Sequence, residues 1–244
     1  NVTLTSVGNP VSMFYGYNIL GFFNTQEEVN GYKAIYEPVG HQPVIPAAVG
    51  RWILEDVNGD NIINAADRKF MGSPHPKFQM GLNLSASYRN FDFTGFLFWN
   101  QGNKIFNQSR HWVDFNIFNM QRSARMLYES WTPELGNNAK LPKLDINDTY
   151  SNSAPMSYYV EDASYLRLKT LQLGYTLPKT LVSKIKIDRL RVYVQTQNLF
   201  TITKKEYTGL DPDSGLSGTD LSMGVVDNLS PTPKQILFGV SLGF

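Results

Sequence analysis

The stretch that begins at Asp56 has the oxygen-bearing side chains and the spacing of a calcium-binding loop. Asp56, Asn58 and Asp60 occupy positions 1, 3 and 5, where such loops carry side-chain oxygens. Ile62 would supply a backbone carbonyl at position 7, and Asp67 would supply a carboxylate at position 12. Ca²⁺ takes about six to eight oxygen ligands, and this spacing wraps several of them around one point. The sequence therefore predicts a structural Ca²⁺ site, with an Asx-rich turn that holds no metal as the alternative.

The loop departs from the usual calcium-loop pattern at two positions. Position 6 is Asn61 instead of glycine, although asparagine tolerates the left-handed conformation that this position requires. Position 12 is Asp67 instead of glutamate, and no helix is predicted before the loop. The turn itself is therefore the firmer expectation, and the bound metal is the further hypothesis.

A group of ring side chains in the segment 102–162 is a second candidate site: His111, Trp112, Phe115 and Phe118. Sugar rings and peptide side chains bind well against such faces, so these residues are candidates for contact with a substrate or a partner protein. A helix from Asn119 to about Trp131 is predicted after them, from helical spacing of apolar residues and a possible Asn cap. Packing of the segment onto itself is the alternative role for all of these rings.

Catalytic chemistry finds little support in the residues. The three histidines are scattered among predicted loops: His41, His75 and His111. No Ser/His/Asp arrangement and no phosphate-binding glycine loop is visible, and there is no cysteine for thiol chemistry or disulfides. Three aspartates in a Gly/Ser-rich segment are better explained as turn formers than as catalytic groups: Asp211, Asp213 and Asp220. We therefore do not expect an enzyme.

Composition and charge narrow the class of protein further. The 244 residues include 22 basic and 21 acidic side chains, so a net charge of +1 gives no electrostatic case for nucleic-acid binding. Charged residues make up 18% and aromatic residues 13%, which suits a protein that shows rings to something other than water. No apolar run approaches the roughly 18 residues of a transmembrane helix, so any membrane crossing must use strands. The chain begins at Asn1 without a signal peptide, as expected of a mature or truncated product.

Period-two alternation of apolar and polar residues is the main structural signal. It predicts strands of about ten residues, the length that a tilted strand needs to cross a bilayer. The predicted strands are residues 77–88, 91–101, 163–177, 189–201 and 234–244, with 1–7 as the end of a sixth.

The connections between these strands alternate strictly in length. Arg89-Asn90 and 178–188 are short, whereas 8–76, 102–162 and 202–233 are long. Short periplasmic turns and long outer loops are typical of an outer-membrane barrel, which would place the C-terminus in the periplasm. About six strands cannot close such a barrel, so the remaining strands must come from upstream residues or from another chain.

Several passages, taken together in order and spacing, resemble the C-terminal region of the SusC/RagA family of TonB-dependent outer-membrane transporters. The resemblance covers almost the whole chain. The passages are Phe14–Tyr17, Gly21–Phe23, Asp56–Asp60, Asp67-Arg68, Gly72–Phe78, Tyr88–Asp92, Trp131–Pro133, Asp162–Leu168, Leu171–Pro178, Val192–Phe200 and Tyr207–Pro212.

The resemblance implies an all-β fold, in which residues 1–244 form the C-terminal portion of an antiparallel transmembrane β-barrel of about 22 strands. The N-terminal plug domain would be absent from this chain, and the calcium-like insertion at about 50–70 would lie in an extracellular loop. The family imports glycans or peptides across the Bacteroidota outer membrane with energy from TonB, under a SusD-like surface lipoprotein that acts as a lid. The alternative is a calcium-dependent surface module that binds carbohydrate or protein without transport.

Overall fold

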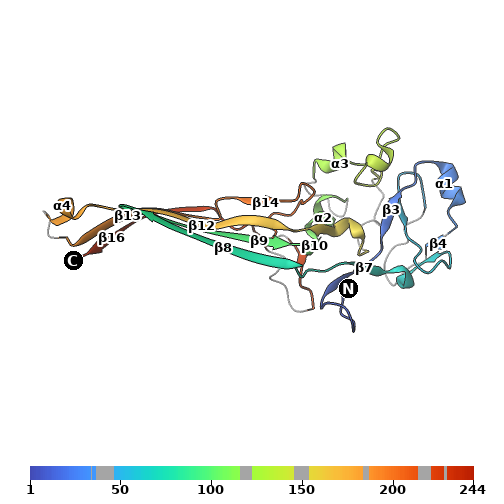
Figure 1. Ribbon diagram of the computed structural model, residues 1–244. Helices are drawn as coiled ribbons and strands as arrows, with labels where there is room; N and C mark the ends of the chain where they lie inside the picture. The colour runs from blue at the N-terminus through green and yellow to red at the C-terminus, as the bar shows by residue number, and fades with distance from the viewer. Residues whose placement is uncertain are drawn as a thin grey trace. The chain divides into compact units, whose positions relative to one another are not determined.

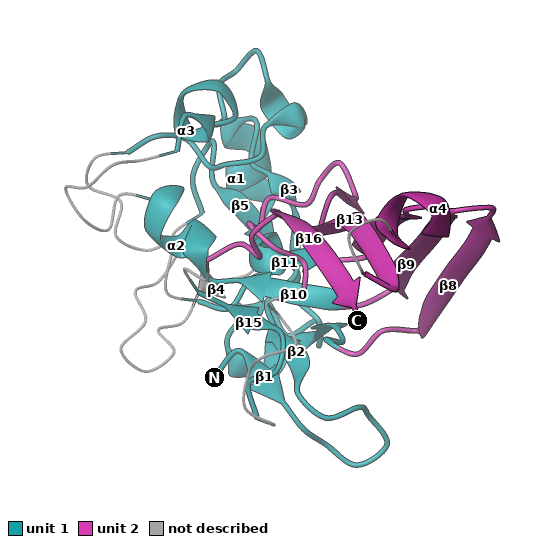
Figure 2. Ribbon diagram, turned by 90° about the vertical axis from the view of Figure 1, so that its left-hand side faces the viewer, with its two compact units in different colours: residues 1–74, 104–161, 214–229 teal, residues 75–103, 162–213, 230–244 magenta. Residues whose placement is uncertain are grey.

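A computed structural model of the chain describes residues 1–33, 35–36, 47–115, 123–145, 154–183, 187–213, 221–227 and 230–244 (Figure 1). The chain divides into two compact units (Figure 2). Unit 1 comprises residues 1–74, 104–161 and 214–229, and unit 2 comprises residues 75–103, 162–213 and 230–244. No helix in these described ranges combines the length and the apolar character needed to cross a membrane.

Unit 2 is built on an antiparallel sheet in which β16, β13, β12, β9 and β8 lie side by side in that order (Figure 1). Its long strands are β8 (Phe78–Tyr88), β9 (Phe91–Gln101), β12 (Tyr165–Thr176), β13 (Arg189–Gln197) and β16 (Gln235–Gly243). The short strand β14 (Thr201–Thr203) pairs with β12, and the one-turn helix α4 (Lys179–Val182) follows β12. The expected all-β, antiparallel fold is confirmed.

The connections sort by length to the two ends of this sheet. At one end, Phe78 pairs with Gln101, and Gln197 pairs with Gln235. The long connections leave from this end: β9 ends here and β12 begins here, and likewise β13 ends here and β16 begins here. The opposite end carries the two short connections.

The tight turn between β8 and β9 forms where the sequence predicts it. Arg89 adopts a left-handed backbone conformation with φ 53°, which a two-residue hairpin connection requires of at least one residue. Asn90 Nδ2 donates to the carbonyl of Thr176 at 2.6 Å, and Thr176 N donates back to the Asn90 carbonyl at 2.8 Å. The turn is thereby fixed to the end of β12.

Two expected strands differ from the structure. Residues 1–7 contribute only β1 (Thr3–Leu4), which pairs with β2 in unit 1 and not with the long sheet. The strand predicted at 189–201 ends at Gln197, because Asn198 turns out of the ladder with φ 51°. Its backbone N–H donates to the carbonyl of Lys169 at 3.0 Å, beside the bulge between Leu168 and Thr170. After this turn the chain resumes as β14, which pairs with Tyr165–Arg167 of β12.

Unit 1 consists of short strands and single-turn helices. Three-stranded sheets are formed by β1, β2 (Met13–Gly16) and β7 (Lys69–Gly72), and by β11 (Val160–Asp162), β10 (Lys104–Asn107) and β15 (Val225–Val226). Two-stranded pairs are formed by β3 (Ile19–Phe22) with β5 (Trp52–Leu54), and by β4 (Ile35–Tyr36) with β6 (Ile62–Ile63). The helices are α1 (Gln26–Gly31), α2 (Ser109–Val113) and α3 (Arg125–Tyr128), with 3₁₀ turns at Ala65–Asp67, Gly136–Asn138 and Ser157–Tyr159.

A core rich in aromatic rings holds these short elements together. Its buried members include Phe14, Tyr17, Phe22, Trp52, Phe106, Phe115, Trp131 and Tyr159. Large rings bury much apolar area per residue, which compensates for the little area that two-residue strands provide. The buried guanidinium of Arg110 lies beside this core. It stacks over the Tyr158 ring, with 3.7 Å from its carbon to the ring centroid, and its NH1 donates to Glu161 Oε1 at 3.1 Å.

The helix predicted from Asn119 to about Trp131 is described only in part. Asn119 and Met120 lie outside the described residues, and the described remainder forms the single turn α3. Trp131 lies beyond this turn, where it is buried and its Nε1 donates to Asn24 Oδ1 at 3.1 Å. Its role is core packing in unit 1.

Candidate functional site

One face of the unit 2 sheet is apolar across all five long strands. The pairing register places Leu82 of β8 opposite Leu97 of β9, and Leu97 opposite Leu168 of β12. Residues two apart share a face, so the same face carries Met80 and Leu84 on β8, Leu171 and Leu173 on β12, Val192 and Val194 on β13, and Ile236, Phe238 and Val240 on β16. Leu82 is 45% exposed and Phe238 is 84% exposed, so much of this face is open within unit 2, although Leu168, toward the end with long connections, is buried. An apolar face of this extent fits a hydrocarbon environment and not water.

Aromatic pairs mark both ends of the apolar face. Phe78 and Trp99 lie edge to face with ring centroids 4.8 Å apart at the end with long connections. Phe91 and Tyr175 lie 4.7 Å apart at the end with short turns. Rings gathered at both borders of an apolar band are typical of strands that span a bilayer, because amphipathic rings prefer the two interfaces.

The opposite face of the sheet is mainly polar, although it includes Phe96, Phe98 and Tyr193, and it carries an ion pair near the short turns. Arg191 of β13 binds Asp92 of β9 through two parallel hydrogen bonds, one of which joins Nε to Oδ1 at 2.9 Å. Gly174 of β12 lies between these strands, and any side chain there would collide with the pair. Glycine at this position therefore leaves room for a charge bridge that ties three strands together.

A second group of charges gathers where the long connections leave the sheet. Arg167 of β12 is 3% exposed; its Nε donates to Thr201 Oγ1 at 2.8 Å, and its NH2 lies 2.5 Å from Asp211 Oδ1. Asp213 accepts from the Tyr165 hydroxyl at 2.6 Å and from Lys169 Nζ at 2.6 Å. A buried arginine requires such partners, since burying an unpaired charge is costly.

Asp211 is the centre of this group and holds both stems of the connection between β14 and β16, that is, the residues near Asp213 that follow β14 and the residues near Thr232 that precede β16. Its carboxylate accepts the backbone N–H groups of Asp213 and Thr232, each at 2.9 Å, in addition to Arg167. Burial by itself raises the pKa of Asp211, but hydrogen bonds from Thr232, Asp213 and Arg167 outweigh it and lower the pKa to about 2. Asp211 is therefore ionised at any physiological pH.

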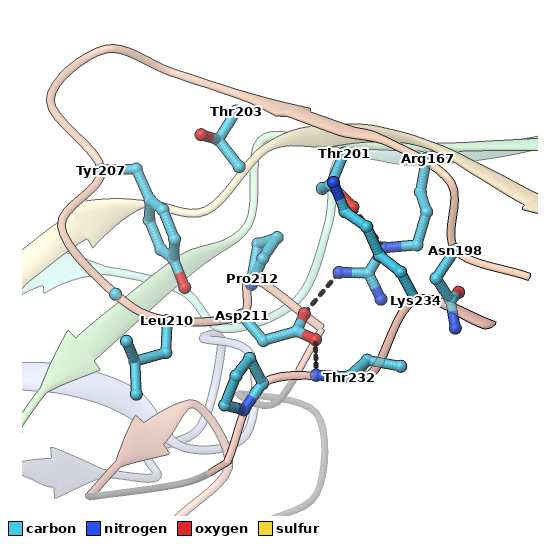
Figure 3. Close-up of a pocket in the computed structure, with 12 residues that line it drawn as sticks. Arg167, Asn198, Thr201, Thr203, Tyr207, Leu210, Asp211, Pro212, Thr232 and Lys234 are labelled. Atoms are coloured by element: carbon cyan, nitrogen blue, oxygen red, sulfur yellow. Dashed lines mark hydrogen bonds and ion pairs between the residues drawn. The ribbon is translucent and has the colours of Figure 1, made fainter.

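A cavity of about 330 Å³ opens beside this carboxylate within unit 2 (Figure 3). Its lining combines charged, hydroxyl and amide side chains with apolar ones: Arg167, Asn198, Thr201, Thr203, Tyr207, Gly209, Leu210, Asp211, Pro212, Pro231, Thr232 and Lys234. Pockets of roughly 300–1,000 Å³ with a few placed polar groups are typical of small-molecule sites.

The predicted calcium loop has the expected shape at its first six positions. Asp56 accepts the N–H groups of Gly59 at 2.7 Å and Asn61 at 2.8 Å, and Asn61 adopts the left-handed conformation with φ 62°. Asp60 N donates to Asn58 Oδ1 at 3.0 Å, which continues the chain of Asx turns. The asparagine at position 6 thus replaces the usual glycine without changing the turn.

The closing carboxylate of the loop has a different environment. Asp67 is fully buried, and its two oxygens accept from Val57 N at 2.9 Å and Asn64 N at 2.8 Å. Among the residues that the structure describes, no group of three or more His, Asp or Glu side chains is placed to hold a metal ion. Each oxygen of a carboxylate can accept two bonds, so Asp67 keeps capacity for a ligand even while it closes the loop.

The predicted ring cluster is only partly assembled. The rings of His111 and Trp112 meet edge to face at 4.7 Å, and Trp112 Nε1 donates to Asp227 Oδ1 at 3.1 Å. Phe115 is buried and lies 5.8 Å from the ring of Trp52, so it belongs to the core of unit 1. Phe118 lies outside the described residues. His111 and Trp112 are therefore the half-buried members of the predicted cluster among the residues that the structure describes.

The remaining residues singled out in the sequence do not form a reactive site in the described chain. His75 belongs to unit 2 and His111 to unit 1, whereas His41 and Asp220 lie outside the described residues. The charge group around Arg167 was the feature that sequence reasoning missed. The available signal was an arginine within an alternating strand, which requires a carboxylate from elsewhere in the chain.

No protein-family model matches the chain, but curated proteins and solved structures are similar to it. TonB-dependent receptor P26 of Formosa agariphila is 29% identical over 242 residues, which is 98% of this chain and 23% of that protein. TonB-dependent receptor SusC of Bacteroides thetaiotaomicron is 27% identical over 216 residues, covering 87% of this chain and 19% of that protein. The chain thus spans less than a quarter of the length of these relatives.

Two solved structures share the fold over the whole chain. One is described as the RagAB peptide transporter, with a TM-score of 0.72 and 24% identity over 24% of that chain. The other is the RagAB peptide importer in an 'open-open' state, with a TM-score of 0.71 and 24% identity over 23% of that chain.

Proposed function

We infer that this chain, a relative of the SusC/RagA group of TonB-dependent receptors, forms part of a barrel that imports nutrients across a bacterial outer membrane. The observation that carries the proposal is the apolar face shared by five strands, which carries many exposed apolar side chains and is bordered by aromatic pairs. Strands of nine to twelve residues are long enough to cross the hydrocarbon when tilted.

The two outer strands of the sheet require further partners. In the described residues, β8 and β16 each pair with a neighbour on one side only. Unpaired backbone groups in lipid cost several kcal/mol each, so membrane-spanning sheets must close. We propose that strands outside this chain complete the barrel, in agreement with the small share of its relatives that the chain spans.

The connections give the orientation that we propose. The end of the sheet with long connections faces the cell exterior, and the end with Arg89-Asn90 and α4 faces the periplasm. β16 runs toward the short-turn end, since Gly243 pairs with Arg189, so its last residues lie on the periplasmic side.

Cargo and partners follow from the relatives and remain part of the proposal. A TonB-dependent receptor named SusC and a structure described as the RagAB peptide transporter are among the similar proteins. We propose glycans or peptides as cargo, TonB as the energy source acting through residues beyond this chain, and a SusD-like lipoprotein as the outer lid. Trp112 is the residue of the outer segments that we assign to cargo or lid contact.

We also propose that the Asp56–Asp67 loop binds Ca²⁺ weakly and for a structural purpose. Asp56, Asn58 and Asp60 already form the successive turns of a calcium loop. The carbonyl of Ile62 and a free lone pair of Asp67 would complete the oxygen set. Bound Ca²⁺ would then stiffen a long outer connection.

The alternative function is a calcium-dependent surface module that binds carbohydrate or protein, which the calcium-loop geometry favours. The two functions differ in what covers the apolar face of the sheet. A transporter needs lipid or detergent there, whereas a water-soluble module would be monodisperse without either. The exposed leucines and phenylalanines of that face favour the transporter.

The test is a pair of arginine substitutions on neighbouring residues of β8 in the full-length protein. Leu82→Arg places a charge on the apolar face near mid-strand, which costs roughly 2–4 kcal/mol in a bilayer. Asn83→Arg places the same charge on the polar face, where water or protein can solvate it. We expect Leu82→Arg to reduce the heat-modifiable barrel in the outer-membrane fraction and Asn83→Arg to leave it unchanged. Equal behaviour of the two variants would contradict the assignment of faces.

A further inference from the structure

We propose that the cavity beside Asp211 is a binding site for a small carboxylate with an apolar body, about the size of one acylated amino acid. The cavity lies entirely within unit 2, so the proposal depends on that unit alone. It goes beyond nutrient import, because it assigns a ligand class to a site whether or not the protein transports that ligand.

One side of the cavity carries a cation and hydrogen-bond donors. Figure 3 shows Arg167, Asn198, Thr201 and Lys234 together on this side. Lys234 is exposed and has no ion-pair partner among the residues that the structure describes. The Thr201 hydroxyl oxygen accepts from Arg167 Nε at 2.8 Å, which leaves its own proton free to donate. A carboxylate is the group that an ammonium and neighbouring hydroxyl or amide donors bind best.

The other side of the cavity is apolar. Figure 3 places Tyr207 and Leu210 opposite the cationic side, with Pro212 between. A side chain at Gly209 would collide with the Tyr207 ring, so glycine lets the ring lie against the backbone. Leu210 is 70% exposed, which an apolar ligand body would reduce. The two sides together match a ligand with one charged end and one apolar end.

The charges around the cavity favour an anionic ligand, although the carboxylate of Asp211 is part of the cavity wall. Asp211 is engaged by Arg167, by Thr232 N and by Asp213 N, so its charge is compensated within the wall. Beyond it, Asp213 is engaged by Lys169 and by the Tyr165 hydroxyl. Lys234 is then the cation left to attract a ligand. The same hydrogen bonds hold the wall in place before binding, which lowers the ordering cost of association.

The test uses the full-length protein in detergent and two probes that differ only at the charged end. N-acetyl-L-leucine carries the carboxylate, and N-acetyl-L-leucinamide carries a neutral amide in its place. Calorimetry should show the acid binding about tenfold more tightly than the amide, as one charge-assisted interaction provides. Equal affinities for the two probes, or no binding of the acid, would overturn the proposal.

Matched variants locate the site. Lys234→Gln should weaken binding of the acid about tenfold and leave the amide unchanged. Lys205→Gln, an exposed lysine of the same connection that does not line the cavity, should change neither affinity. Leu210→Asn should weaken both probes, because it removes apolar contact and not charge. An equal loss in the Lys234 and Lys205 variants would show general electrostatic attraction and overturn the assignment.

A photoreactive probe gives an independent readout of position. The N-acetylated diazirine analogue of leucine should label peptides that contain Tyr207–Pro212 or Pro231–Lys234, as mapped by mass spectrometry. Labelling that falls elsewhere would place the ligand at another site. The readout measures binding and not uptake, so failure of the import proposal would not affect it.

Discussion

Replacing Asp211 with alanine should release the connection between β14 and β16 from strand β12. The substitution removes the acceptor of three donors at once: Arg167 NH2 at 2.5 Å, and the backbone N–H groups of Asp213 and Thr232 at 2.9 Å. Removing one partner of a buried ion pair costs roughly 3–5 kcal/mol, because the other charge stays buried. Arg167 NH1 keeps Asp213 Oδ2 at 3.3 Å and Nε keeps Thr201, so we expect the lower end of that range, about 3 kcal/mol.

Hydrogen–deuterium exchange of the full-length protein in detergent measures this effect where it occurs. A local destabilisation of about 3 kcal/mol speeds exchange at the Asp213 and Thr232 amides about a hundredfold, whereas the amides of β13 keep their protection. Asp211→Asn retains one acceptor oxygen and should show a smaller increase. Asp188→Ala removes an exposed aspartate of the same unit and serves as the matched control. Unchanged exchange at both amides in Asp211→Ala would refute the reasoning, because Asp211 would then hold neither stem.

Three further results are expected. Acid should loosen the attachment of Asp213 and Thr232 to Asp211. The stabilising contribution of Asp211 is complete above the ordinary aspartate pKa of about 4 and is lost as the pH falls through its lowered pKa of about 2. Pepsin cleavage within 204–234 should therefore rise over that interval in the wild type and not in Asp211→Asn, and a flat profile in the wild type would contradict this. Under the proposed import function, Trp112→Ala in the full-length protein should weaken cargo uptake or lid binding without loss of assembled barrel, with Trp112→Phe as the milder control that keeps a ring. Normal uptake and lid binding in the alanine variant would return Trp112 to loop packing. Calorimetry should show Ca²⁺ binding with a dissociation constant of about 10⁻⁴ to 10⁻³ M that is lost in Asp56→Ala and retained in Glu134→Ala, and the absence of any calcium heat in the wild type would exclude the site.

The long strands were predictable from the sequence because their signal is local. Alternation of apolar and polar side chains needs only neighbouring residues, and it predicts 77–88 and 234–244 where the structure has Phe78–Tyr88 and Gln235–Gly243. The left-handed Asn61 was predictable for the same reason, since one residue type in one turn position determines it.

The pairings of unit 1 could not be predicted in this way. β10 pairs with β15 through Phe106 and Val225, more than a hundred residues away in sequence. Strands as short as Val225–Val226 show no period, and their formation depends on an aromatic core assembled from distant segments. Sequence pattern carries no information about such contacts when each strand has only a few residues.

The Arg167 group shows a prediction that was incomplete. Asp211 was interpreted as a turn former, and its Oδ1 does accept the N–H of Asp213 two residues on. The same carboxylate also pairs with Arg167, a contact across 44 residues that turn chemistry does not reveal. Local rules thus identify one of the carboxylate's roles and leave the long-range one to the structure.

The single-sided pairing of β8 and β16 has a consequence for how the protein must be made. Within the described residues, each presents a long row of unpaired backbone groups beside a band of exposed leucine, valine and phenylalanine side chains. Unpaired strand edges of this kind can pair with strands of other chains, and such pairing leads to aggregation. If the chain is exported as the proposed function requires, these strands must be shielded from water until the barrel closes. The same feature predicts that this segment, produced alone in bacteria, will collect in inclusion bodies and not in the soluble fraction.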